Sequence, residues 1–292
     1  MKAIKGLILF CFLAAGISSC FTPPEFSNHL TISFNKIEFK TSPDPSDADS
    51  LIIYIDFRDG DGDMGLNESY RDEPYHEQTF YLENTVDGKV EPIGTVQMQV
   101  SATGLPSSLP MIHVSNPIGK LVTNRSRDNG FGFLPAFSSA DLGCRNYELR
   151  ELLISPASKN VIDTSTFNVI GTLRDQSGAE YYVIRDTLYF TRNLDFYNIR
   201  VRFYQSTAGP GGPFTEYSWE DELCQTFNGR FPILANGSGP LEGTIRYAMP
   251  SAGFLPIFSI KDLQLDIIVK DRARNRDSIR TQPFKLADIK VN

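Results

Sequence analysis

Short apolar runs with the spacing of β-strands recur along most of the chain. Residues 32–39 alternate apolar and polar positions, and residues 51–57 form a mostly apolar, β-branched run. Similar runs, separated by clusters of Gly, Pro, Asn and Asp, lie at residues 95–100, 167–173, 181–190, 199–204, 243–247 and 265–269. Helical periodicity is weak, and residues 139–153 are its best candidate. Alternation with frequent turn residues is typical of sheets, so the pattern predicts an all-β protein.

One segment occurs twice. Residues 132–142 (GFLPAFSSADL) and 253–263 (GFLPIFSIKDL) agree at eight of eleven positions. Each copy is followed by a strand, an Asp-containing turn and another strand, which indicates a duplicated β-sandwich. That strand–turn–strand pattern resembles the last hairpin of bacterial immunoglobulin-like domains. The resemblance implies two tandem immunoglobulin-like β-sandwich modules, a longer one over residues 31–192 with insertions and a shorter one over residues 193–292.

The first twenty residues have the pattern of an export signal. A basic start over residues 1–5 is followed by an apolar run over residues 6–16 that is too short to span a bilayer. The Ser-Ser-Cys ending resembles the lipobox of bacterial lipoproteins. This resemblance implies cleavage before Cys20, a covalent lipid on Cys20, and a membrane anchor followed by a Pro-containing tether over residues 21–30. The alternative is a plain signal peptide with an incidental cysteine.

The charge of the chain excludes some partners. The 292 residues carry a formal net charge of −7, and loss of two lysines with residues 1–20 would leave 26 basic and 35 acidic residues, a charge of −9. An acidic surface argues against binding to nucleic acid or to anionic lipid. Beyond the signal no apolar run approaches the roughly 20 residues of a membrane-spanning helix, so the lipid would be the only anchor.

Cysteine usage agrees with an envelope location. With Cys11 removed and Cys20 acylated, only Cys144 and Cys224 remain. In an oxidising compartment such a pair can form one disulfide across a long loop. Two separate buried thiols are the alternative.

The strongest chemical signal is the Asp-rich loop, residues 59–68 (DGDGDMGLNE). Asp59, Asp61 and Asp63 place three carboxylates at alternate positions, and the glycines between them let the chain curl so that the oxygens converge. Ca²⁺ binds 6–8 such oxygens. The loop therefore predicts a calcium site at a strand end, with Asn67 or Glu68 completing it. The alternative is an acidic, solvated turn that holds no ion.

The loop departs from an EF-hand. Met64 stands where the turn glycine belongs and Tyr70 where the bidentate glutamate belongs, and a strand rather than a helix precedes the loop. Residues of the terminal hairpin (Asp271, Asn275 and Asp277) would join the site only if the two modules packed with these loops together. For Asp271 and Asn275 the sequence favours a turn-forming role.

Three motifs resemble those of a broad class of uncharacterised Bacteroidetes lipoproteins. They are the DGDGDMGL segment at residues 59–66, the NGRFP segment at 228–232, and the KDRARN segment at 270–275. The resemblance implies a lipid anchor, an envelope address and an immunoglobulin-like fold, and it brings no assigned reaction.

No catalytic constellation is evident. His29, His76 and His113 are far apart and form no metal-binding motif, and His76 is interpreted as a solvated loop histidine. Trp219, the single tryptophan, could stack on a sugar but is more typical of a core position. We therefore expect a non-enzymatic, lipid-anchored protein of the outer membrane that binds a protein partner. The alternatives are a glycan-binding or accessory subunit of a nutrient importer and, less favoured, a hydrolase with a carboxylate pair.

Overall fold

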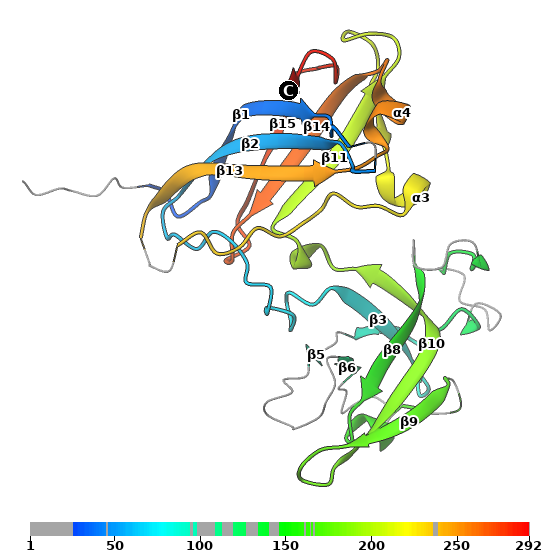
Figure 1. The fold of residues 1–292 in the computed structure, drawn as a ribbon. Helices are drawn as coiled ribbons and strands as arrows, with labels where there is room; N and C mark the ends of the chain where they lie inside the picture. The colour runs from blue at the N-terminus through cyan, green and yellow to red at the C-terminus, as the bar shows by residue number, and fades with distance from the viewer. Residues whose placement is uncertain are drawn as a thin grey trace, which may run out of the picture.

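A computed structural model describes residues 26–44, 46–93, 96–97, 109–112, 119–126, 134–139, 146–160, 162–163, 165, 167–235 and 239–291. The described chain is dominated by strands with a few short helical turns, which confirms the all-β prediction. The strands form two bodies, one above the other in Figure 1. Cys20 and Cys144 lie outside the described residues.

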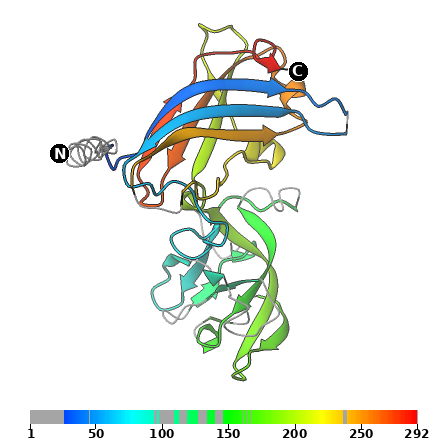
Figure 2. The same cartoon turned by 60° about the vertical axis from the view of Figure 1, so that its left-hand side comes forward.

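The first body, here called the sandwich, combines strands from both ends of the chain. Its first sheet has the order β13-β2-β1-β16, and its second has the order β12-β11-β14-β15. The members of the first sheet are β1 (Thr31–Lys40), β2 (Ser50–Asp59), β13 (Leu241–Pro250) and β16 (Lys290–Val291). The members of the second are β11 (Ile199–Ser206), β12 (Thr215–Tyr217), β14 (Asp262–Lys270) and β15 (Arg276–Arg280). Figure 2 shows β1, β2 and β13 as one curved layer over the second sheet.

The two sheets enclose one continuous apolar core. Alternate residues of β2 and β14, such as Ile53, Ile55, Leu265 and Ile267, are fully buried and meet in the same cluster. Short helices α3 (Trp219–Leu223) and α4 (Phe254–Phe258) close one end of this core with aromatic side chains. The second copy of the sequence repeat contains α4, so its buried apolar residues pack between the two sheets at this end of the core.

The second body, here called the inserted module, lies between β2 and β11 in the chain. Its main sheet has the order β4-β3-β10-β8-β6-β5, with β7 paired to β3 and β9 paired to β10. These strands are β3 (Gln78–Asn84), β4 (Val90–Ile93), β5 (Val96–Gln97), β6 (Pro110–Ile112), β7 (Gly119–Leu121), β8 (Tyr147–Ile154), β9 (Val169–Arg174) and β10 (Glu180–Arg192). Two 3₁₀ turns, η3 (Ser158–Asn160) and η5 (Leu194–Phe196), follow β8 and β10. Three apolar clusters, all separate from the sandwich core, lie in the described part of this module.

The sequence predicted a boundary between two modules at residues 192–193, and the observed pairing of strands does not follow this boundary. Strand β2 pairs along its whole length with β13, so strands from both predicted modules share one sheet. The sequence repeat suggested this division because it identifies segments that are similar locally. The pairing of strands depends instead on which surfaces are buried across the whole fold. Residues 147–153 of the helix candidate are also strand, since β8 pairs with β10 over eight residues.

Candidate functional site

The segments at residues 59–66, 228–232 and 270–275 meet at one end of the sandwich. Leu66 of the Asp-rich loop donates its backbone N–H to the carbonyl of Phe231, at 3.0 Å. The backbone N–H of Arg272, in the terminal hairpin turn (residues 270–275), donates to the carbonyl of Asp63 at 3.3 Å. Segments that are about 160 to 210 positions apart in the chain therefore form one backbone framework, and the aspartates lie inside it.

We call Asp59, Asp61, Asp63 and Asp271 the acid cluster. Carboxylate oxygens of Asp59, Asp63 and Asp271 lie within 4.8 Å of one another. Asp59 and Asp271 are fully buried. Both oxygens of Asp59 and one oxygen each of Asp61 and Asp63 are buried without a hydrogen-bond partner among the described residues. Burying such acceptors is costly unless a donor or a cation compensates.

Backbone and side-chain amides hold two members of the cluster in place. Oδ2 of Asp63 accepts from the backbone N–H of Ala273 at 2.7 Å. Both oxygens of Asp271 accept from Asn275, one from its backbone N–H at 2.7 Å and one from its side-chain amide at 2.8 Å. Arg272 also lies beside the cluster, where its guanidinium donates to the carbonyl of Gly65 at 3.4 Å. The site is thus rigid on one side and has unpartnered oxygens on the other.

Two glycines allow the backbone to close around the acid cluster. Gly62 and Gly65 have φ angles of +71° and +96°. A Cβ atom would lie 2.2 Å from the carbonyl oxygen of Gly239 at the first position, and 2.1 Å from that of Pro232 at the second. Both positions therefore require glycine on two grounds, the left-handed backbone and the close approach of a second chain segment.

The environment disfavours negative charge on the cluster. Burial, followed by the charges of Asp61 and Asp63, raises the pKa of Asp59 to about 7. Burial also raises the pKa of Asp63, against the opposing effect of the Ala273 N–H and Arg272. The pKa of Asp271 is raised by burial as well. The folded chain thus concentrates carboxylates where they resist ionisation unless positive charge is supplied.

The donor set of the acid cluster suits a hard divalent cation. It offers only oxygen atoms, four of which have no other described partner. Ca²⁺ binds 6–8 oxygens in flexible geometry. The carboxylates of the acid cluster, including Asp271, could therefore complete its shell together with water. Softer metals prefer thiols and imidazoles. Among the described residues, the acid cluster contains neither.

The two predicted completing residues lie on the exposed part of the loop. Oδ1 of Asn67 accepts from the backbone N–H and the hydroxyl of Ser69, both at 2.9 Å, which makes Asn67 a turn-forming residue. Asn67 and Glu68 are both exposed. The structure thus groups Asp59 and Asp63 with Asp271 and leaves Asn67 and Glu68 exposed, and ion binding by any of them stays a prediction.

The terminal hairpin turn supplies the residue that sequence reasoning ranked low. Asp271 both forms its turn with Asn275 and contributes a carboxylate to the cluster. Asp277 does not join, because its Oδ2 accepts from the backbone N–H of Ile32 at 2.9 Å. The only signal for Asp271 in the sequence was the KDRARN motif, whose spacing says nothing about which loop it faces.

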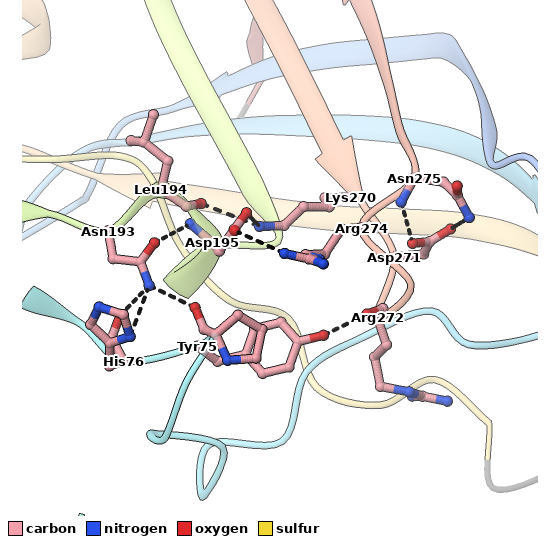
Figure 3. Close-up of polar contacts among 11 residues, drawn as sticks. Tyr75, His76, Asn193, Leu194, Asp195, Lys270, Asp271, Arg272, Arg274 and Asn275 are labelled. Carbon is pink, nitrogen blue, oxygen red and sulfur yellow. Dashed lines mark hydrogen bonds and ion pairs between the residues drawn. The ribbon is translucent and has the colours of Figure 1, made fainter. Parts of the chain in front are cut away.

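The same turn contacts the two linkers that join the sandwich to the inserted module (Figure 3). The outgoing linker is residues 60–77, between β2 and β3, and the returning linker is residues 193–198, between β10 and β11. On the outgoing linker, the hydroxyl of Tyr75 donates to the carbonyl of Arg272. On the returning linker, Asp195 forms ion pairs with Lys270 at 2.7 Å and with Arg274 at 3.9 Å. The side-chain amide of Asn193 joins the two linkers by donating to the carbonyls of residues 74 and 76, at 2.7 and 2.8 Å.

Two other side chains differ from their expected settings. His76 is buried, not solvated, with Nε2 2.9 Å from the hydroxyl of Thr79, and burial lowers its pKa. Trp219 is only 4% exposed and packs edge-on against Phe227 and Phe254 in the sandwich core. Trp219 therefore takes the core role and offers no face to a sugar.

Of the two cysteines predicted to form a disulfide, the structure describes only Cys224. Cys224 follows α3 with a φ angle of +56° and is disulfide-bonded. Its partner lies outside the described residues, as do all the other cysteines of the chain. Pairing with Cys144 stays a prediction.

Among the described residues there is no helix long and apolar enough to cross a membrane. Comparison with protein-family models, with curated proteins and with solved structures gave no significant match.

Proposed function

We propose that this chain is a non-catalytic, lipid-anchored protein of the bacterial outer membrane that binds or scaffolds a protein partner. In this proposal its sandwich and inserted module are immunoglobulin-like, and a Ca²⁺ ion at the acid cluster fixes the loops between them. The lipobox at Cys20 supports the anchor, and the three converging motifs support the fold and the address.

One observation carries the calcium part of the proposal. Asp59 is fully buried and neither of its carboxylate oxygens has a described partner, although Asp61, Asp63 and Asp271 surround it. When it is ionised without a bound cation, Asp59 carries an uncompensated buried charge, because Arg272 lies beside Asp63 and donates to Gly65. A bound Ca²⁺ would supply the charge and accept the unpartnered oxygens.

Calcium binding can be tested by thermal unfolding. After treatment with a chelator, added Ca²⁺ should raise the melting temperature, because an ion that binds only the folded state stabilises it by about 2.7 kcal/mol at a hundredfold excess over Kd. Mg²⁺ at the same concentration should have a smaller effect, since it demands a tighter octahedral shell. Asp59→Asn should abolish the calcium response, and the exposed Asp288→Asn is the matched control. An unchanged melting temperature in the wild-type protein would refute the ion site.

The anchor and the partner require a test in the envelope. Radioactive palmitate should label the wild-type protein and not a Cys20→Ala variant, and the label should fractionate with outer membranes. Cross-linking of the native protein in intact cells should then recover a defined partner protein. Labelling that persists in Cys20→Ala, or a protein recovered with residues 1–20 attached, would contradict the anchor.

A further inference from the structure

A pocket at the junction of the sandwich and the inserted module carries an excess of positive charge. It encloses about 190 Å³ between the returning linker and the terminal hairpin turn. Its charged lining consists of Arg200, Lys270, Arg274, Arg276 and a single carboxylate, Asp195. We call this the basic pocket. Four cations gathered around one acid stand out in a chain whose net charge is −7.

The single carboxylate is already engaged. Asp195 binds Lys270 at 2.7 Å and Arg274 at 3.9 Å, and Lys270 is held further by the carbonyl of Leu194 at 3.3 Å. Figure 3 shows these three charged groups converging beside the turn. Because Lys270 is only 8% exposed, its ammonium group is fixed in the wall of the pocket rather than free in solvent.

Arg200 lacks a partner of its own. This half-buried guanidinium forms no hydrogen bond or ion pair with any of the described residues. The two carboxylates that act on its charge from outside the pocket are each paired with another cation, Asp266 with Arg202 and Glu220 with Arg192 at 3.6 Å. Burial and the charges of neighbouring arginines lower the pKa of Arg200, against the smaller opposing effects of Asp266 and Glu220.

We infer that the basic pocket binds a tetrahedral oxyanion, a phosphate or sulfate group. An arginine guanidinium donates two parallel hydrogen bonds to such oxygens, and the ammonium group of a lysine can donate a further one from another side. Arg200 and Arg276 would face the anion without a competing protein acid, while Asp195 positions Lys270 and Arg274. The volume exceeds that of the bare ion, so the pocket can admit the group on a larger carrier. None of the residues that line the basic pocket belongs to the acid cluster.

Isothermal titration of the full chain in chloride buffer of matched ionic strength tests the inference. Sodium sulfate and, in the chelated protein, sodium phosphate should bind saturably with one-to-one stoichiometry. Arg200→Gln and the exposed Arg276→Gln should each weaken binding by at least about tenfold, the loss expected for one charge-assisted hydrogen bond. Arg185→Gln is the control, because it removes the same charge from an exposed pair with Glu151 on the inserted module.

Glycerol 1-phosphate and glucose 6-phosphate distinguish a carried group from a free ion. Binding of these esters at least as tight as that of inorganic phosphate supports a site for a phosphorylated carrier, and loss of binding supports a site for the free ion. The inference is overturned if titration shows no saturation, if sodium acetate binds equally well, or if Arg185→Gln weakens binding as much as Arg200→Gln. Melting temperatures of all variants verify that each is folded, and calcium-dependent stability, measured separately, reports on the acid cluster.

Discussion

Replacing Asp59 with asparagine should stabilise the calcium-free protein at neutral and alkaline pH, although it removes a proposed ligand. The pKa of Asp59 is raised from 3.8 to about 7 in the folded chain. Below about pH 4 the carboxyl is protonated in both the folded and the unfolded states, so it contributes no difference. Between pH 4 and pH 7 the unfolded state loses its proton first, and the free energy of unfolding therefore falls as the pH rises.

The size of this effect follows from the shift. A difference of about three pKa units corresponds to about 4 kcal/mol once the pH exceeds 7. For a protein of this size that change moves the melting temperature by on the order of 10 °C. Asparagine has nearly the same shape and cannot ionise, so Asp59→Asn should lack this loss. In a chelator at pH 8 the variant should melt above the wild-type protein, and the gap should close as the pH is lowered to 4.

Saturating calcium should reverse the order. The ion compensates the charge of wild-type Asp59 and stabilises the folded state, whereas the variant offers one ligand fewer. The assay is thermal unfolding of both proteins from pH 4 to pH 8, with chelator and with Ca²⁺. Only the difference between them is interpreted, because other groups, such as buried His76, titrate in both. If Asp59→Asn melts below the wild type in chelator at pH 8, the carboxylate is not unfavourable in the folded chain and the reasoning is refuted.

Two further predictions concern the backbone and the cysteines. Gly65→Ala should destabilise the protein by at least about 2 kcal/mol in urea unfolding, because its Cβ would lie 2.1 Å from the carbonyl oxygen of Pro232 in addition to the backbone strain. Gly88→Ala is the control: it has a φ angle of +70° with nothing within 4 Å of the added atom, so it should cost about 1 kcal/mol, and equal losses would contradict the close approach. Peptide mapping without reduction should recover Cys144 linked to Cys224, and a free Cys144 thiol would exclude that pairing.

The sequence by itself determined the local features of this protein. Alternation at residues 32–39 and short apolar runs bounded by turn residues at 51–57 and 181–190 predicted β1, β2 and β10 close to their observed bounds. The Asp–Gly alternation predicted a loop with converging carboxylates at Asp59, Asp61 and Asp63. These signals lie within a few residues of one another, so they survive without knowledge of the fold.

Only the tertiary structure decided which segments meet. The pairing of β2 with β13, the place of Asp271 in the acid cluster, and the gathering of Arg200 with Lys270 all join residues about 70 or more positions apart. Burial of His76 and Trp219 depends in the same way on elements that pack over them. Such contacts are selected by the free energy of burying apolar surface over the whole chain, to which any single stretch of sequence contributes only a small part.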